Sequence, residues 1–144
     1  IGVDAVAEVI DACLENPIIP QPQDESLATA AKKLSKKEAT VSFARSAPDV
    51  RSRIHGLIPW PGCDVTVGEM TVRLKRVRSE DRDVSESVVP GTMIDDGLIA
   101  CREGAIRLLE VQPPDKGVMS WEAFQRGRNL PIGTVFSPIA DRES

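Results

Sequence analysis

The stretch that decides the fold is residues 46–67, SAPDVRSRIHGLIPWPGCDVTV. It begins with the S-x-x-D pattern of a capping box, and apolar residues recur at helical spacing from Val50 to Leu57. The PWPG sequence at 59–62 ends that helix, because proline interrupts helical hydrogen bonding. Beyond the turn, apolar and polar residues alternate, as they do along a β-strand with one buried face. The stretch therefore predicts a helix at about residues 47–58, followed by a β domain.

The residues that follow predict short antiparallel strands joined by tight turns. The alternation along one strand changes phase, which predicts a β-bulge at Lys75-Arg76. The sequence Asp95-Asp96-Gly97 is typical of a hairpin turn, and a last strand is expected at residues 134–136. One helix, capped by Ser120 and closed by Gly127, interrupts the strands. The pattern favours a mainly β fold: a small antiparallel OB-like barrel with a preceding helix and one inserted helix.

The part of the chain before this domain contains another helix and a linker. Residues 3–14 place apolar side chains on one helical face, and Asn16-Pro17 ends the helix. Such an apolar stripe needs a surface to pack on, and the Pro- and Gln-rich residues after it offer none. We therefore interpret residues 1–16 as the end of another domain, residues 17–39 as an extended interdomain linker and residues 40–144 as the OB-like domain.

The 144 residues have a formal net charge of −4, but the charge is unevenly distributed. Residues 32–79 contain 11 basic and 4 acidic residues, whereas the chain after residue 82 contains 6 basic and 10 acidic residues. A polyanion could therefore bind the middle third and would be repelled by the rest. No apolar stretch reaches the roughly 20 residues that a membrane span needs, so we expect no membrane partner.

The search for catalytic or metal-binding residues finds no convincing set. The single histidine, His55, has no evident carboxylate or cysteine partner and is expected to be exposed or to pack its helix. Asp95-Asp96 stands where a turn favours aspartate before glycine, and Cys63 and Cys101 are expected to be small core residues. Three cysteines without a C-x-x-C pair favour reduced thiols in a cytoplasmic protein over a zinc site. We therefore predict no catalytic residue and no metal ligand in this chain.

The basic residues of the middle third are the one functional signal that composition supplies. Phosphate backbones are recognised mainly through such charges, although linkers and edge strands also carry lysine and arginine for solubility. The five aromatic residues, Trp60 among them, each have a plausible packing role, which argues against a stacking surface. The candidate nucleic-acid-binding residues are four linker lysines and four basic residues of one strand: Lys32, Lys33, Lys36, Lys37, Arg73, Lys75, Arg76 and Arg78.

Several motifs occur in an order that resembles one enzyme family. They are PQDESLATAAKKLSKKEA at residues 22–39, PWPG at 59–62, PGT at 90–92, GAIRLLEVQP at 104–113, Met119-Ser120 and Gly133. The ordered set covers nearly the whole chain and is similar to the carboxyl-terminal part of methionyl-tRNA formyltransferases. Ser42-Phe43 departs from the family's pattern, in which Asp-Trp is often found at that place.

The resemblance implies a two-domain parent enzyme that formylates initiator methionyl-tRNA in translation initiation, with formyl-tetrahydrofolate as the formyl donor. It implies that residues 1–16 are the last helix of the amino-terminal catalytic domain and that the OB-like domain helps to hold initiator tRNA. The family's catalytic residues belong to the amino-terminal domain. This chain alone is therefore expected to bind no cofactor and to be inactive.

Two functions remain open at this point. The first is a tRNA-binding accessory domain of a methionyl-tRNA formyltransferase, which the basic middle segment favours. The alternative is a structural carboxyl-terminal domain of a related formyltransferase, or of a formyl-tetrahydrofolate hydrolase or dehydrogenase, with a small-molecule substrate. The acidic balance of the later barrel sequence favours this second function.

Overall fold

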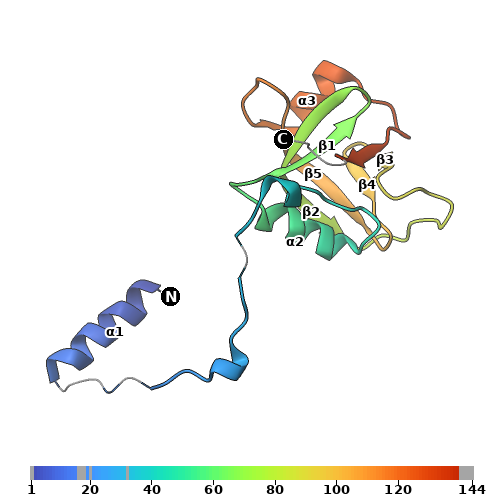
Figure 1. The fold of residues 1–144 in the computed structure, drawn as a ribbon. Helices are drawn as coiled ribbons and strands as arrows, with labels where there is room; N and C mark the ends of the chain where they lie inside the picture. Colours follow the sequence, from blue (N-terminus) through green and yellow to red (C-terminus); the bar gives the residue numbers. More distant parts are fainter. Residues whose placement is uncertain (1, 16–18, 20, 32, 140–144) are drawn as a thin grey trace. The chain divides into compact units, whose positions relative to one another are not determined.

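The computed structural model describes residues 2–15, 19, 21–31 and 33–139, and the chain divides into two compact units, residues 1–32 and 33–144 (Figure 1). The first unit contains helix α1 (Gly2–Glu15) and one turn of 3-10 helix, η1 (Glu25–Leu27). The helix predicted at residues 3–14 is confirmed. Its assignment to another domain stays a prediction. Within the described residues, no helix is long and apolar enough to cross a lipid bilayer.

The second unit contains helix α2 (Ala47–Gly56), which starts where the capping-box pattern predicts. Ser46 Oγ accepts a hydrogen bond from the Asp49 N–H at 3.4 Å, which caps the first turn. The helix ends at Gly56, slightly before the predicted end, because the chain already turns into the PWPG sequence. One face of α2 is buried against the sheet, so its remaining side chains are left for the surface.

Antiparallel strands form one curled sheet in the order β3-β4-β5-β2-β1-β7, and β6 pairs with β5. The mainly β fold with three helices confirms the predicted fold class. The short strand β6 was not predicted, because two residues carry no alternation that a sequence pattern could show. The strands are β1 (Cys63–Val67), β2 (Met70–Glu80), β3 (Met93–Asp95), β4 (Leu98–Ala100), β5 (Ala105–Gln112), β6 (Met119–Ser120) and β7 (Phe136–Pro138).

The two edges of the curled sheet are linked, as an OB-like barrel requires. An antiparallel bridge pairs Thr92, just before β3, with Val135, just before β7. Next to it, the Phe136 N–H donates to the Gly91 carbonyl at 2.8 Å. Backbone groups that would be unpaired at an open edge therefore have partners here. The last strand lies two residues later than predicted, at 136–138.

The bulge predicted at Lys75-Arg76 is confirmed. Leu74 pairs with Val111 and Arg76 pairs with Glu110, so Lys75 has no partner on β5. A regular strand would point the apolar residues before and after this position to opposite faces. A second shift between Arg76 and Val77 returns the register, and with this local irregularity the apolar residues before and after it are buried in one core.

Helix α3 (Trp121–Arg128) lies at the opposite end of the barrel from α2 (Figure 1). Ser120 caps it as predicted, and its Oγ accepts a hydrogen bond from the Ala123 N–H at 3.2 Å. The predicted end at Gly127 is wrong, because Asn129 ends the helix with a φ of +51°. Asparagine tolerates this left-handed conformation, so glycine is not needed there.

The hairpin between β3 and β4 seats Trp121 in the core. A Cβ atom at Gly97, where φ is +69°, would lie 2.6 Å from the indole ring. The indole N–H of Trp121 donates to Asp96 Oδ1 at 2.7 Å. The Asp-Gly pair therefore does more than form the predicted turn, because it also leaves room for the ring and binds its polar atom.

Gly97→Ala is expected to destabilise the barrel more than Gly68→Ala. Both glycines have positive φ, so alanine costs about 1–2 kcal/mol at either position. At Gly97 the methyl group would also meet the Trp121 ring, which adds roughly 1–3 kcal/mol, whereas nothing lies within 4 Å of a Cβ at Gly68. Urea denaturation of the two variants measures the difference. Equal losses in the free energy of unfolding would contradict the proposed packing.

Candidate nucleic-acid interface

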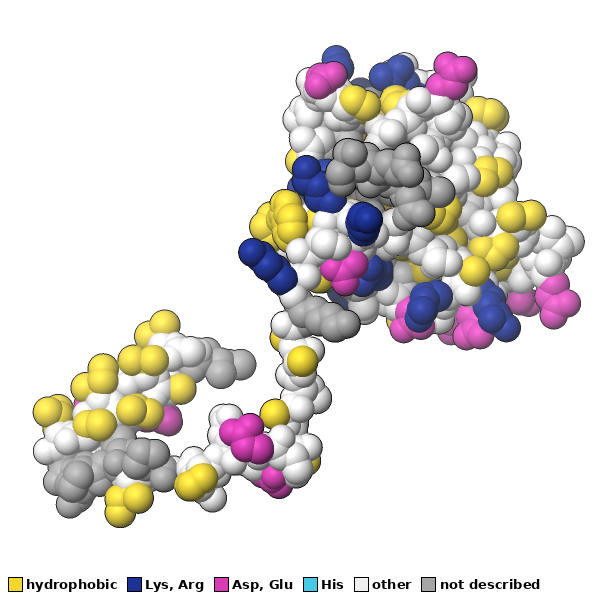
Figure 2. Space-filling view, in the orientation of Figure 1, with side chains coloured by type: hydrophobic (Ala, Val, Ile, Leu, Met, Phe, Trp, Pro, Cys, Tyr) yellow, Lys and Arg dark blue, Asp and Glu magenta, His cyan; other side chains and the backbone are white. Residues whose placement is uncertain are grey.

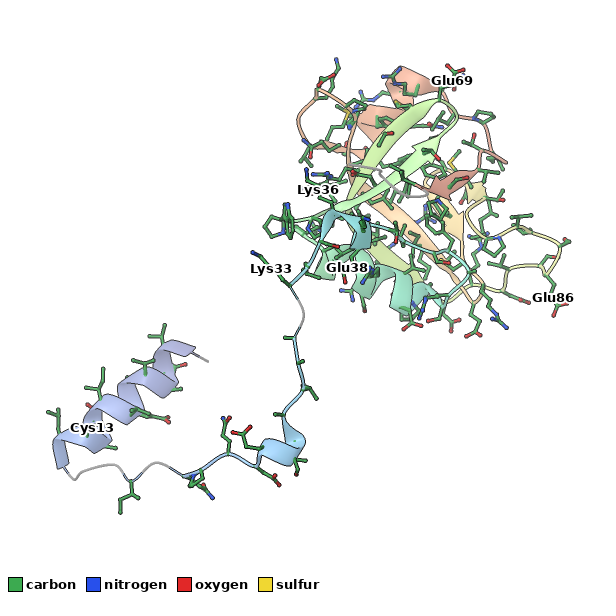
Figure 3. All side chains as sticks on the ribbon, viewed as in Figure 1. Cys13, Lys33, Lys36, Glu38, Glu69 and Glu86 are labelled. Carbon is green, nitrogen blue, oxygen red and sulfur yellow. The ribbon has the colours of Figure 1, made fainter. Side chains whose placement is uncertain are left out.

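The described linker lysines belong to the second unit and are exposed on the segment that leads to α2 (Figure 3). One turn of 3-10 helix, η2 (Lys36–Glu38), orders this segment. The Ser35 N–H donates to Glu38 Oε2 at 2.7 Å across the turn. Lys32 lies outside the described residues, so three of the four predicted lysines are placed: Lys33, Lys36 and Lys37.

Arg53 on α2 attaches this segment to the barrel domain. Its Nη2 donates to the Glu38 carbonyl at 2.5 Å, and its Nε donates to the Thr40 carbonyl at 3.3 Å. Hydrogen bonds from a charged guanidinium group are stronger than those between neutral groups. The lysines of η2 are therefore held beside α2, although they fall within the range predicted to be linker.

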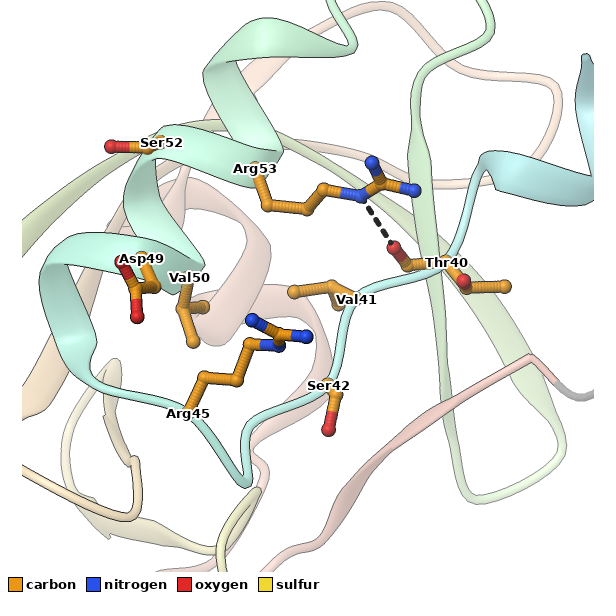
Figure 4. Close-up of a pocket in the computed structure, with 8 residues that line it drawn as sticks. All are labelled: Thr40, Val41, Ser42, Arg45, Asp49, Val50, Ser52 and Arg53. Carbon is orange, nitrogen blue, oxygen red and sulfur yellow. Dashed lines mark hydrogen bonds between the residues drawn. The ribbon is translucent and has the colours of Figure 1, made fainter. Parts of the chain in front are cut away.

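A cavity of about 550 Å³ lies between α2 and the chain segment before it (Figure 4). Its charged lining residues are Arg45, Asp49 and Arg53. Figure 4 shows that Arg45 and Arg53 approach the cavity from different elements, the first from the loop and the second from the helix. Guanidinium groups bind phosphate and carboxylate oxygens, so two of them against one carboxylate favour an anionic group at this place.

The bulge turns all four predicted basic residues of β2 away from the core. A regular strand would send two of them to each face, because side chains alternate. The unpaired residue at Lys75 changes that alternation, and only the apolar residues of the strand are buried. The strand residues predicted to contact nucleic acid thus share the outer face: Arg73, Lys75, Arg76 and Arg78.

Three of these four side chains are paired with carboxylates of the same domain. Lys75 forms no salt bridge within the described residues, but a phosphate group would have to displace a carboxylate from each of the others. The shortest N–O distances are 2.7 Å for Arg73–Asp64, 3.5 Å for Arg76–Glu110 and 3.0 Å for Arg78–Glu80.

The Arg73–Asp64 pair is the most buried of the three. Arg73 donates from Nε to Asp64 Oδ1 at 2.7 Å and from Nη2 to Oδ2 at 3.1 Å, and the Asp64 side chain is only 6% exposed. The hydrogen bonds to Asp64 raise the pKa of Arg73. Gly62 makes room for this arrangement, since a Cβ there would lie 2.8 Å from Arg73 Nε. Arg73 is therefore committed to the fold.

Glu80 binds two arginines at the other end of β2. Arg107 Nε donates to Glu80 Oε1 at 2.6 Å, and Arg78 Nη2 donates to the same oxygen at 3.0 Å. The pKa of Glu80 is lowered, chiefly by the hydrogen bond from Arg107. One carboxylate thus partly neutralises two guanidinium groups at this end of β2.

The basic residues around α2 form no salt bridge within the described part of the chain. Residues 33–60 carry six basic and two acidic side chains, and Figure 2 shows dark-blue side chains where this segment enters the barrel domain. The sequence analysis did not include Arg45, Arg51 and Arg53 among its candidates. Arg51 and Arg53 lie off the apolar stripe of α2, and this position in the sequence indicates that they are exposed. We name these six residues the α2 cation group: Lys33, Lys36, Lys37, Arg45, Arg51 and Arg53.

The two buried cysteines are core residues, as predicted. Burial raises the pKa of Cys63 and of Cys101 to about 12, so both thiols stay protonated at neutral pH. A protonated, buried thiol is a poor nucleophile and a poor metal ligand. Neither residue therefore adds chemistry to the surface formed around α2.

His55 joins α2 to the bulge of β2, which is the helix-packing role predicted for it. Its Nε2 accepts a hydrogen bond from the Val77 N–H at 3.2 Å, so this nitrogen carries no proton. Burial lowers the pKa of His55, and the positive charges of Arg51 and Arg76 lower it further. A neutral histidine thus holds together the two elements that carry most of the candidate basic residues.

Comparison with known proteins places this geometry in a family. Residues 33–129 match the family described as "Formyl transferase, C-terminal domain". The match begins at Lys33 and ends just after α3. This chain belongs to the formyl transferase C-terminal domain family. The match includes every residue of the α2 cation group and most strands of the barrel.

Several bacterial proteins named methionyl-tRNA formyltransferase are similar to this chain. The protein of Afipia carboxidovorans is 42% identical over 132 residues, which cover 90% of this chain and 42% of that protein. The protein of Gluconacetobacter diazotrophicus is 38% identical over 121 residues, covering 83% and 38%. That of a Chelativorans species is 39% identical over 137 residues, covering 92% and 43%. The chain thus spans about two fifths of the length of these relatives.

In this formyl transferase C-terminal domain, His55 is expected to make stability fall as the pH drops from about 7 to 5.5. The unfolded chain binds a proton at the ring with a pKa of about 6.5, while the lowered pKa of the folded ring makes it bind that proton less readily. The unfolded state then holds more protons, so acid favours it. His55→Gln keeps a hydrogen-bond acceptor but does not titrate, and it should flatten the dependence. Urea denaturation at several pH values measures this, and identical slopes for the two proteins would refute it.

Proposed function

We propose that this chain is the carboxyl-terminal part of a methionyl-tRNA formyltransferase and that it holds initiator tRNA through electrostatic contacts. The relatives described above carry this enzyme's name and match 83–92% of the chain, which supports this function over a small-molecule formyltransferase. The parent enzyme would use formyl-tetrahydrofolate as its donor and act in the cytoplasm during translation initiation. The formyl transfer itself would take place on a catalytic domain, with this chain contributing affinity for the tRNA.

The observation that carries the tRNA contact is the difference between paired and unpaired basic residues. Three of the four basic residues on β2 are bound to carboxylates, whereas the six residues of the α2 cation group have no such partner within the described ranges. An unpaired cation can release its own counterions and those of a phosphate without first losing a salt bridge. The α2 cation group is therefore the favoured centre of the contact, with Lys75 beside it.

The arrangement of η2 supports short-range phosphate binding. Arg53 holds the segment by two backbone carbonyls, which leaves the amino groups of Lys36 and Lys37 exposed on an ordered turn. Ordered donors lose less conformational entropy on binding than lysines of a free linker. With about three to five contacts, affinity should be in the weak range of roughly 10⁻⁴–10⁻⁶ M and should decrease steeply with salt.

The experiment compares two double variants that remove the same charge. Lys36→Gln with Lys37→Gln removes two cations that form no salt bridge with any residue that the structure describes, and Arg76→Gln with Arg78→Gln removes two cations that are bound to carboxylates. In titrations of initiator tRNA at several salt concentrations, the lysine double variant should bind more weakly. Its salt slope should decrease by about two, since each lost phosphate contact changes the slope by roughly one.

The arginine double variant is the matched control, because its net charge equals that of the lysine variant. We expect it to change tRNA affinity little, provided circular dichroism shows the barrel still folded. An equal loss in both variants would mean that only overall charge matters. Absence of binding at low salt, or binding that ignores salt, would overturn the proposed function.

A further inference from the structure

Trp60 is the exception among the aromatic residues. Each aromatic residue was expected to have a packing role, but Trp60, in the PWPG turn, is 51% exposed. The other four aromatic residues are at most 4% exposed. Proline on each side limits the backbone freedom of the turn, so the indole is presented from a stiff support. A large apolar ring held in water in this way is costly unless a partner covers it.

The turn that carries Trp60 lies among the cations already described. It follows the carboxyl-terminal end of α2, and Trp60 is seven residues after Arg53. On its other side, Gly62 lies directly against the Arg73 guanidinium group. The exposed indole is therefore carried by a turn that directly follows the helix of Arg51 and Arg53.

We propose that Trp60 is a stacking platform for an unpaired base of the RNA that the α2 cation group binds. This inference rests on the proposed function and adds a partner chemistry to it. The flat faces of an indole stack on any base, and nearby lysine and arginine side chains bind the phosphates on either side. The combination of an exposed aromatic ring with flanking cations is the usual composition of a single-strand binding surface.

Charge complementarity favours a nucleic acid over a protein as the group that covers Trp60. A protein surface that covers an exposed indole is typically apolar at its centre and poor in charged residues. Here the residues from 33 to 60 contain six basic and two acidic side chains, so a neutral apolar partner would have to desolvate several unpaired cations. A base linked to phosphates covers the ring and neutralises the cations at the same time.

Fluorescence provides a direct test, because the chain has two tryptophans in different environments. Trp121 is 4% exposed and cannot contact RNA, so a change on titration reports Trp60. Initiator tRNA, and a short single-stranded oligonucleotide taken from one of its loops, should quench the fluorescence of the unsubstituted chain. Trp60→Phe leaves only Trp121, and its fluorescence should not respond, although the variant should bind within about threefold of the original affinity.

Trp60→Leu separates stacking from simple burial. Leucine keeps an apolar side chain but has no flat face, so tRNA affinity should decrease by about 5- to 100-fold, the range measured for loss of one stacked base. The salt slope should stay unchanged, because no phosphate contact is lost. The fluorescence of Trp121 shows whether the variant is folded, and if it is not, quenching of the unsubstituted chain decides the question.

The outcomes distinguish this inference from the proposed function. If Trp60→Leu binds as tightly as the unsubstituted chain while the lysine double variant is still weakened, stacking is overturned and the tRNA contact stands. Failure of RNA to quench the unsubstituted chain also overturns stacking. If no RNA binds at low salt, both inferences fail, and Trp60 is then a contact for protein.

Discussion

The hydrogen bond from the Val77 N–H to His55 Nε2 joins the two features on which the rest of the structure depends, helix α2 and the bulge of β2. β2 pairs with β1 on one side and with β5 on the other, so its register affects the whole sheet. The bulge lets apolar residues before and after it face one core, but it interrupts the ladder and leaves backbone groups to be satisfied elsewhere. His55 supplies an acceptor at that place. The helix that stabilises the bulge is also the helix that carries Arg51 and Arg53, so the position of the cations follows from the same packing.

The features that sequence could predict are those encoded by neighbouring residues. The change of period after the PWPG turn, the phase shift at Lys75-Arg76 and the caps of α2 and α3 are local patterns, and the structure confirms them. The end of α3 was wrong because asparagine and glycine both adopt positive φ, and the rule prefers glycine. The salt bridges could not be predicted in the same way. Arg107 and Glu80 are 27 residues apart and meet only because β2 pairs with β5.

The candidate site illustrates the same limit in its electrostatics. Counting basic residues gives the η2 segment and β2 equal weight. In the folded domain Arg73, Arg76 and Arg78 form salt bridges, whereas the lysines of η2 form none among the described residues. The two exposed pairs, Arg76–Glu110 and Arg78–Glu80, are expected to contribute little to stability, whereas the Arg73–Asp64 pair is largely buried. These carboxylates neutralise basic side chains on the outer face of β2, so the basic residues without salt bridges among the described residues lie mainly around α2. The exposure of Trp60 was not predicted for a related reason, since sequence gives no measure of how far a turn stands out from the core.

A domain with nearly zero net charge can still bind a polyanion when its basic residues are grouped on one part of the surface and its acidic residues lie elsewhere. The net charge of the chain is −4, which on its own argues against tRNA as a partner. At physiological ionic strength, however, charges further apart than about 8 Å are largely screened from one another. A phosphate at η2 is therefore affected mainly by the charges close to it, which include Lys36, Lys37 and Arg53. Weak long-range steering with adequate short-range contact is compatible with the proposed accessory role, in which other contacts between the parent enzyme and the same tRNA would raise the effective concentration of the tRNA at this surface.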